Sequence, residues 1–193
     1  MAPLTQPHPQ PVRHPNLVLI GYRATGKTSV GARLAEALQR PFVDLDQVLI
    51  REAGRSVAAI VAQGGWAEFR QLEKQLVARF RDAQGQVLAT GGGVVLDPDN
   101  VAALRENGIL IWLRADPAAI QARLTQDQPR DANRPSLTGE DTIREVAVVA
   151  EARAPLYQAA AQISIDTTHR SVTQVVKLVL AALKSEEIKD LGG

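Results

Sequence analysis

A loop pattern near the start of the chain constrains the fold more than any other stretch. Residues 21–28 read GYRATGKT, which matches the phosphate-binding pattern Gly-x-x-x-x-Gly-Lys-[Ser/Thr]. A continuous apolar run precedes the loop at residues 17–20, and Val30, Leu34 and Leu38 follow it at a helical spacing. A strand, a loop and a helix in this order direct backbone N–H groups and the positive end of the helix dipole into one concavity. The pattern therefore predicts a nucleoside triphosphate site, against the alternative of a chance glycine turn.

The loop and the next strand supply groups that suit a metal-bound triphosphate. Lys27 is expected to reach the β- and γ-phosphates, and the Thr28 hydroxyl to bind Mg²⁺. Residues 41–46, PFVDLD, predict a second strand that ends in Asp44 and Asp46. Side chains two apart on a strand point the same way, and the carboxyl end of a parallel strand faces the ligand crevice. We expect one carboxylate to hold hydrated Mg²⁺ and the other to accept a hydrogen bond from a substrate hydroxyl; a solvated acidic turn is the alternative.

Composition excludes several other classes of protein. The 193 residues suit one domain, and 22 basic against 21 acidic residues give a net charge of +1, which argues against a nucleic-acid partner. The chain has no cysteine, so disulfides, thiolate metal sites and cysteine nucleophiles are excluded. No apolar run approaches the roughly 20 residues needed to cross a bilayer. We expect a cytoplasmic monomer without a membrane partner.

Further apolar runs predict the rest of a layered fold. Strands are expected at residues 87–89, 109–113 and 163–165. Helical spacing predicts helices between and after them, at residues 57–61, 69–80, 98–106, 118–125, 141–160 and 172–183, with Ser56 as a cap and a break at residues 64–65. Five short strands that alternate with helices predict a parallel sheet covered on both faces.

Three features outside the loop are candidates for ligand contact. Successive glycines at residues 91–93 are costly to order, which favours a close approach of ligand to backbone over a flexible turn. Arg70 either pairs with Glu73 at the surface or presents its planar guanidinium to a carboxylate ligand, and the spacing does not decide between them. The polar segment at residues 126–140, which contains Arg134, is either a lid that closes over phosphates or an ordinary exposed loop.

Taken together, these motifs resemble those of the shikimate kinase family, over about residues 16–184. The family belongs to the nucleoside-monophosphate-kinase-like branch of the P-loop fold. The matching motifs are the GYRATGKT loop, Phe42-x-Asp44-x-Asp46, Phe69-Arg70-x-x-Glu73, Gly91-Gly92-Gly93, Arg134-Pro135 and Arg153-x-x-x-Tyr157. The resemblance implies a three-layer α/β/α fold whose five-stranded parallel sheet has the order 2-3-1-4-5, with a lid. It also implies ATP-dependent phosphorylation of the 3-hydroxyl of shikimate, in aromatic amino-acid biosynthesis.

The resemblance implies a role for each matching residue. Lys27, Asp46 and Arg134 are the implied catalytic residues, and Thr28 and Asp44 lie on the magnesium side. Contact with ATP is implied for Arg23, Ala24, Thr25, Gly26, Lys27, Thr28, Ser29, Arg123, Arg134 and Arg170. Contact with shikimate is implied for Asp46, Arg70, Gly91, Gly92, Gly93 and Arg153, with the two arginines on its carboxylate.

The chain departs from the family pattern in the loop and in the lid. Ala24 stands where the family usually has glycine, and we expect its φ to be negative, because alanine avoids positive φ. The lid reads Arg-Pro-Ser-Leu at residues 134–137, where the family usually has Arg-Pro-Leu-Leu.

One domain is expected at residues 16–187. A proline-rich, disordered tail precedes it at residues 1–15, and a flexible end follows at residues 188–193. A polyproline ligand is the alternative for the tail.

Other functions remain open at this point. Gluconate kinase is the nearest rival, because a linear sugar acid also requires arginines. A nucleoside-monophosphate kinase is disfavoured, since a flat base prefers aromatic or apolar walls and aromatic residues make up only 4% of the chain. A non-catalytic nucleotide-binding relative would be expected to lack Lys27, Asp46 or an acceptor-site arginine, and all are present.

Overall fold

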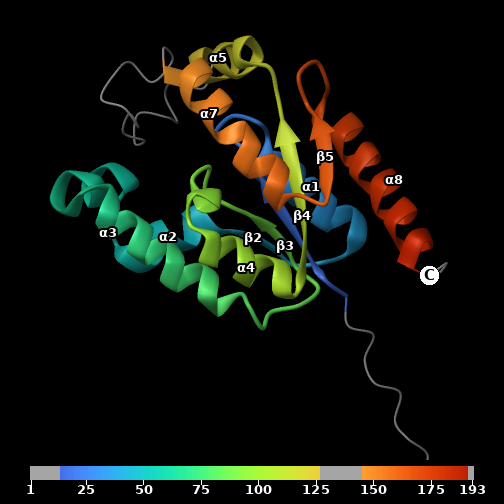
Figure 1. The fold of residues 1–193 in the computed structure, drawn as a ribbon, viewed down its shortest axis with the longest axis horizontal. Coiled ribbons are helices and arrows are strands. Elements are labelled where there is room, and N and C mark those ends of the chain that lie inside the picture. Colours follow the sequence, from blue (N-terminus) through green and yellow to red (C-terminus); the bar gives the residue numbers. More distant parts are fainter. Residues whose placement is uncertain (1–13, 127–144, 191–193) are drawn as a thin grey trace, which may run out of the picture.

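The computed structural model describes the backbone of residues 14–126 and 145–190, and the side chains of residues 14–126 and 145–185 (Figure 1). Arg134, nearly all of the predicted lid and most of the predicted N-terminal tail lie outside these ranges. The described residues contain the phosphate-binding loop, Asp44 and Asp46, the triple glycine and Arg153.

A single parallel sheet forms the middle layer. Its strands are β1 (Asn16–Ile20), β2 (Phe42–Asp44), β3 (Val87–Ala89), β4 (Gly108–Arg114) and β5 (Ile163–Asp166). They are arranged in the order β2-β3-β1-β4-β5, and every neighbouring pair is parallel. The predicted sheet order and the three-layer fold are confirmed.

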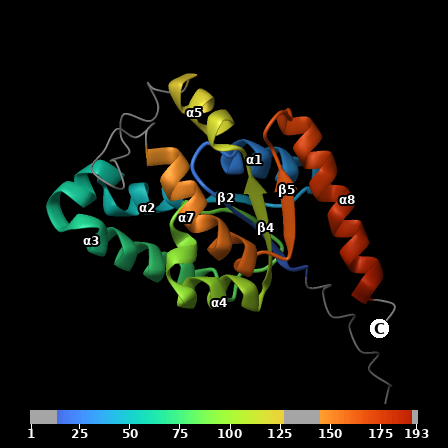
Figure 2. The same cartoon turned by 45° about the horizontal axis from the view of Figure 1, so that its top comes forward.

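Helices cover both faces of this sheet (Figures 1 and 2). The helices are α1 (Lys27–Leu38), α2 (Leu45–Ala53), α3 (Val57–Arg79), α4 (Pro98–Glu106), α5 (Pro117–Gln126), α7 (Glu145–Ala160) and α8 (Val172–Asp190), with a short 3-10 turn, η1 (Val94–Leu96). α1 and α8 pack together on one face, whereas α2, α3, α4 and α7 contribute to the core on the other.

The alternation of side chains along β1 separates the two cores. Leu17 and Leu19 pack into the cluster with α1 and α8, and Val18 and Ile20 into the cluster on the opposite face. All four side chains are at most 2% exposed, as expected for the central strand of a sheet covered on both faces. A third cluster joins Tyr22 to α5 and α7, so the start of the phosphate-binding loop is packed against both helices that flank residues 127–144.

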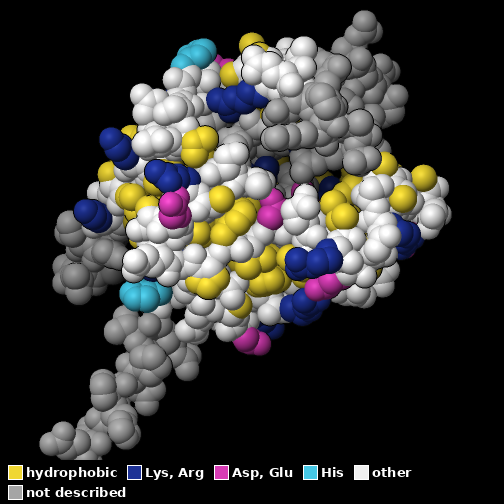
Figure 3. All heavy atoms as spheres, turned by 180° about the vertical axis from the view of Figure 1, so that it is seen from behind, with side chains coloured by type: hydrophobic (Ala, Val, Ile, Leu, Met, Phe, Trp, Pro, Cys, Tyr) yellow, Lys and Arg dark blue, Asp and Glu magenta, His cyan; other side chains and the backbone are white. Residues whose placement is uncertain are grey.

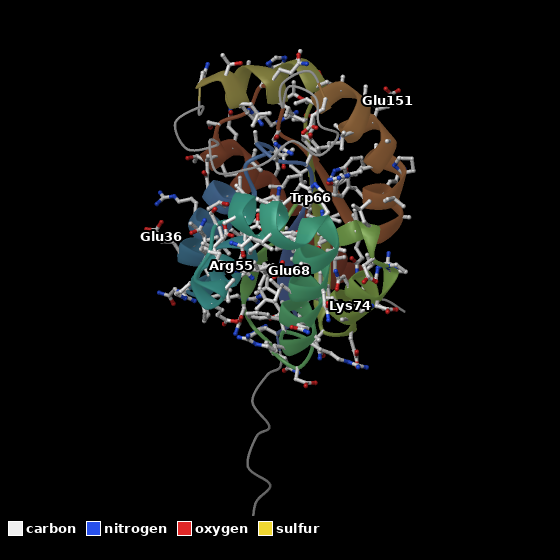
Figure 4. All side chains as sticks on the ribbon, turned by 90° about the vertical axis from the view of Figure 1, so that its left-hand side faces the viewer. Glu36, Arg55, Trp66, Glu68, Lys74 and Glu151 are labelled. Atoms are coloured by element: carbon white, nitrogen blue, oxygen red, sulfur yellow. The ribbon has the colours of Figure 1, made fainter. Side chains whose placement is uncertain are left out.

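Helix α3 contains a bend that the paired glycines predict. The Ser56 hydroxyl caps the helix by accepting a hydrogen bond from the Ala59 N–H at 3.1 Å, and Gly65 then leaves helical geometry at φ 70° and ψ −178°. Arg55 spans the bend, since it donates to Gln63 before it and pairs with Glu68 after it at 2.7 Å (Figure 4). These two contacts connect the parts of α3 on either side of the bend.

The face of the molecule opposite Figure 1 is mixed in character (Figure 3). Basic, acidic and hydrophobic side chains are interspersed on it. No helix in the described part of the chain combines the length and apolar character that crossing a bilayer requires.

Candidate active site

The phosphate-binding loop connects β1 to α1, as the sequence predicts. Gly26 takes φ 97°, which suits glycine, and α1 begins at the next residue. The buried Lys27 ammonium donates hydrogen bonds to the backbone oxygens of Gly21 and Tyr22, each at 2.8 Å. These bonds hold the ammonium against the loop, beside the N–H groups that start the helix.

Ala24 contradicts the expectation of a negative φ. Its φ is +57°, in the left-handed region that glycine occupies freely and alanine disfavours by about 1–2 kcal/mol. Two contacts maintain the conformation: the Arg123 guanidinium donates to the Ala24 oxygen at 3.1 Å, and the residue packs against the Tyr22 cluster of α5 and α7. The loop conformation therefore depends on tertiary contacts that the local sequence does not reveal.

A cavity of about 670 Å³ opens over the loop and the amino end of α1. All the described residues predicted to contact ATP line it, namely Arg23, Ala24, Thr25, Gly26, Lys27, Thr28, Ser29, Arg123 and Arg170. Arg123 is fixed by bonds to the Ala24, Thr167 and Thr168 backbone oxygens, and Arg170 by one to the Asp166 oxygen at 2.8 Å. Size and charge suit a nucleoside triphosphate.

The donor set at one side of this cavity fits Mg²⁺. The Thr28 hydroxyl donates to Asp44 Oδ2 at 2.7 Å, so one hydroxyl and one carboxylate lie together at the loop. The described residues hold no group of three or more metal-ligating His, Cys, Asp or Glu side chains. Mg²⁺ at kinase sites characteristically takes one or two protein ligands and completes its shell with phosphates and water, so the pair is sufficient.

The predicted strand over residues 41–46 is too long. β2 ends at Asp44, whose Oδ1 accepts a hydrogen bond from the Gln47 N–H at 3.2 Å and caps α2. Asp46 therefore lies in the first turn of a helix rather than on the strand. Both carboxylates still line the nucleotide cavity, as the sequence predicts.

A second, smaller cavity of about 60 Å³ adjoins the first. It brings together every residue predicted to bind shikimate, namely Asp46, Arg70, Gly91, Gly92, Gly93 and Arg153. Arg23, Asp46, Val57 and Gly92 line both cavities, so these residues mark where the two meet. An anionic, hydroxylated ligand matches a cavity that is lined by both arginines and carboxylates.

Arg70 and Glu73 form a pair that is not at the surface. Arg70 Nη1 and Glu73 Oε2 are 2.6 Å apart, and Glu73 is only 5% exposed, so the interpretation as a solvent-exposed ion pair is wrong. The guanidinium also lies 5.5 Å from the Trp66 ring and 5.2 Å from the Phe69 ring. Burial raises the pKa of Glu73, against the opposing influence of Arg70. Arg70 is therefore held from several sides with its guanidinium at the cavity.

The triple glycine makes room for these side chains. A Cβ on Gly91 would lie 2.7 Å from an Asp46 oxygen and 2.8 Å from a Glu73 oxygen, and a Cβ on Gly93 would lie 2.0 Å from Arg70 Nη2. None of the three glycines has a positive φ. Close approach of these side chains, rather than backbone conformation, explains the absence of a side chain at Gly91 and Gly93.

Helix α7 completes the cavity. Arg153 Nη1 and the Tyr157 hydroxyl both donate to the Gly92 oxygen, at 3.2 and 2.5 Å. Tyr157 is buried and stacks on Trp112, with ring centroids 5.8 Å apart, and its burial raises the pKa of the phenol so that it stays a donor. The four-residue spacing of Arg153 and Tyr157 thus places both side chains on the same backbone oxygen.

The sequence interpretation did not identify Trp66, which lines the small cavity, or Glu145, which contacts Arg23. Trp66 stands four residues before Arg70, one helical turn away, so the spacing could have indicated it. Glu145 pairs with Arg23 at 3.1 Å across 122 residues of chain, and no local pattern points to that contact.

Comparisons with known proteins agree with this geometry. The sequence profile of the shikimate kinase family matches residues 23–184. A shikimate kinase of Symbiobacterium thermophilum is 43% identical over 169 residues, covering 88% of this chain and 96% of the relative, and a shikimate kinase 2 of Yersinia enterocolitica is 40% identical, covering 90% and 98%. The structure of an Acinetobacter baumannii shikimate kinase in complex with shikimate superposes with a TM-score of 0.82 and 31% identity, covering 90% of this chain and 94% of that one. The chain belongs to the shikimate kinase family.

Proposed function

We propose that the protein transfers the γ-phosphoryl group of ATP to the 3-hydroxyl of shikimate and releases ADP and shikimate 3-phosphate. The observation that carries the proposal is the junction of the two cavities, where Asp46 lines both. A nucleotide over the loop and an acceptor between Arg70 and Arg153 would meet at this carboxylate.

The identity of the acceptor is inferred from the charged side chains around the small cavity. Arg70 and Arg153 reach the small cavity from α3 and α7, and paired guanidinium groups suit a single carboxylate. Asp46 accepts hydrogen bonds from ring hydroxyls. The relative from Acinetobacter baumannii, solved with shikimate, supports this assignment.

In the transfer step the acceptor oxygen attacks the γ-phosphorus as the bond from that phosphorus to the β-phosphate oxygen breaks. The hydroxyl proton passes to Asp46, and ADP leaves. Lys27 leaves the loop carbonyls that it contacts at 2.8 Å and neutralises charge on the phosphate oxygens. Mg²⁺, held by Thr28 and Asp44, supplies further positive charge when bound. A role for Arg134 at the same group stays a prediction.

Two variants test the two assigned roles through different kinetic parameters. Asp46→Asn keeps the shape and removes the base, so we expect kcat to fall at least about 100-fold while ATP affinity is kept. Arg153→Ala removes an acceptor contact, so we expect a raised KM for shikimate above all. Steady-state kinetics with phosphorus NMR of the product measure both effects. A nearly unchanged kcat in Asp46→Asn, or an unchanged KM in Arg153→Ala, would refute the corresponding role.

We further propose that residues 16–187 make up one catalytic domain. The sheet and its two cores lie within this range. The cytoplasmic location and the monomeric state stay predictions.

A further inference from the structure

Arg23 occupies a position that the loop pattern alone does not require. It stands at one of the variable positions of the phosphate-binding pattern, yet its side chain lines both the nucleotide cavity and the acceptor cavity. It is only 8% exposed, and its guanidinium lies 5.6 Å from the Tyr22 ring. A fully charged side chain is therefore buried at the point where the two cavities meet.

One of the two terminal nitrogens of this guanidinium has a hydrogen-bond partner within the protein. Nη2 donates to Glu145 Oε1 at 3.1 Å, and the side chains of Arg23 and Glu145 are 9% and 1% exposed. Nη1 is buried without a hydrogen-bond partner among the described residues. A buried N–H without a partner costs about 1–3 kcal/mol, more when charged, so an acceptor from a ligand is expected there.

Glu145 is the first residue of α7, the helix that also carries Arg153. The pair therefore joins the phosphate-binding loop to the helix that completes the acceptor cavity. With one nitrogen fixed by Glu145, the planar guanidinium can rotate little, and the direction of Nη1 is set. Glu145 does not line either cavity, and its pair with Arg23 connects it to a residue that lines both.

We propose that Arg23 is a further catalytic residue that donates through Nη1 to the transferring phosphoryl group, and that Glu145 positions it. Guanidinium groups form strong, directional hydrogen bonds with phosphate oxygens, and the junction is where the γ-phosphoryl group would pass from ATP to the acceptor. Arg23 makes and breaks no covalent bond, and it neutralises charge on the oxygens that move. The proposal rests on the proposed function for the identity of the acceptor.

Arg23→Met tests the contact in the full-length protein. We expect kcat with shikimate to fall about 100-fold, the typical effect of removing one donor to transition-state charge, with smaller changes in KM. Calorimetry should show a weaker affinity for a non-hydrolysable ATP analogue but not for ADP, because only the former has a γ-phosphate. An unchanged kcat, or equal losses for the two nucleotides, would overturn the role of Arg23. If the wild type does not phosphorylate shikimate, the proposed function fails, and the nucleotide comparison still decides the role of Arg23.

Glu145→Gln tests the positioning. We expect a fall in kcat of about tenfold, the size of a typical coupling between residues in contact, and a smaller fall in Glu145→Asp. In the Arg23→Met background the same substitution should have almost no further effect on kcat. If Glu145→Gln lowered kcat about tenfold in that background as well, with the melting temperature unchanged, Glu145 would act independently of Arg23 and the proposal would be overturned. The matched control is Glu151→Gln, because Glu151 is exposed on the same helix, α7, and this substitution removes the same charge (Figure 4).

Discussion

Ala24 tests how far tertiary contacts can impose a backbone conformation on a single residue. At φ +57° an alanine is strained, and a glycine is not. We predict that Ala24→Gly raises the free energy of unfolding by about 0.5–1 kcal/mol, since the relief of strain exceeds the added entropy of the unfolded chain. Chemical denaturation measures the change.

The same substitution in a helix provides the control for Ala24. Ala32 is exposed on α1, where glycine is destabilising by about 1 kcal/mol. The two variants should therefore shift stability in opposite directions. If Ala24→Gly lowered the free energy of unfolding as much as Ala32→Gly does, the left-handed conformation of Ala24 would not be strained.

Glu73 links stability to pH through its burial. Because folding raises the pKa of its carboxyl above the ordinary 4.5, its contribution to stability is present below pH 4.5 and is lost as pH rises through the raised value. Relative to Glu73→Gln, the wild type should therefore lose free energy of unfolding as pH increases above 4.5. Urea denaturation of both proteins across this range measures the difference. A difference that grows in favour of the wild type with pH would mean that Arg70 outweighs burial and lowers this pKa.

At the scale of elements, the bend in α3 determines where the acceptor site forms. Gly65 adopts φ 70° and ψ −178°, a region open to glycine and costly for other residues by about 1–3 kcal/mol. A Cβ there would meet nothing within 4 Å, so the cost of Gly65→Ala is conformational rather than steric. Since Trp66 and Arg70 follow the bend, we predict both lower stability and a raised KM for shikimate.

Gly54 is the control for the bend. Its φ is also positive and a Cβ would also meet nothing within 4 Å, but it ends α2 and lines neither cavity. Gly54→Ala should lower stability by about 1 kcal/mol and leave KM unchanged. If Gly65→Ala and Gly54→Ala had equal KM values for shikimate, the bend would not determine the geometry of the acceptor site.

The elements that the sequence predicts well are those with a strong period. The apolar run of β1 and the four-residue spacing in α1 are local signals, and both elements form as expected. β2 ends two residues before the predicted end of the strand, and Asp44 followed three residues later by Gln47 matches a helix-start signal. The Arg23–Glu145 contact had no such signal, because it depends on how α7 packs against the loop.

At the scale of the whole molecule, parallel strand order explains why the site residues converge. β1, β2 and β3 are neighbours in the sheet, so the phosphate-binding loop, the acidic pair and the triple glycine follow carboxyl ends that lie side by side. α7 then brings Arg153 and Glu145 to the same place from the far end of the chain. The order of the motifs in the sequence predicts this convergence. The distances between side chains at the junction of the two cavities can be obtained only from the folded structure.

The most direct test of the account is the choice of acceptor. ADP release should be measured with ATP and Mg²⁺ while shikimate, gluconate and AMP are offered separately at equal concentration. Arg70, Arg153 and Asp46 around the small cavity predict turnover with shikimate alone. Turnover with gluconate or AMP, or binding of ATP without turnover on any of the three, would contradict the assignment of this cavity.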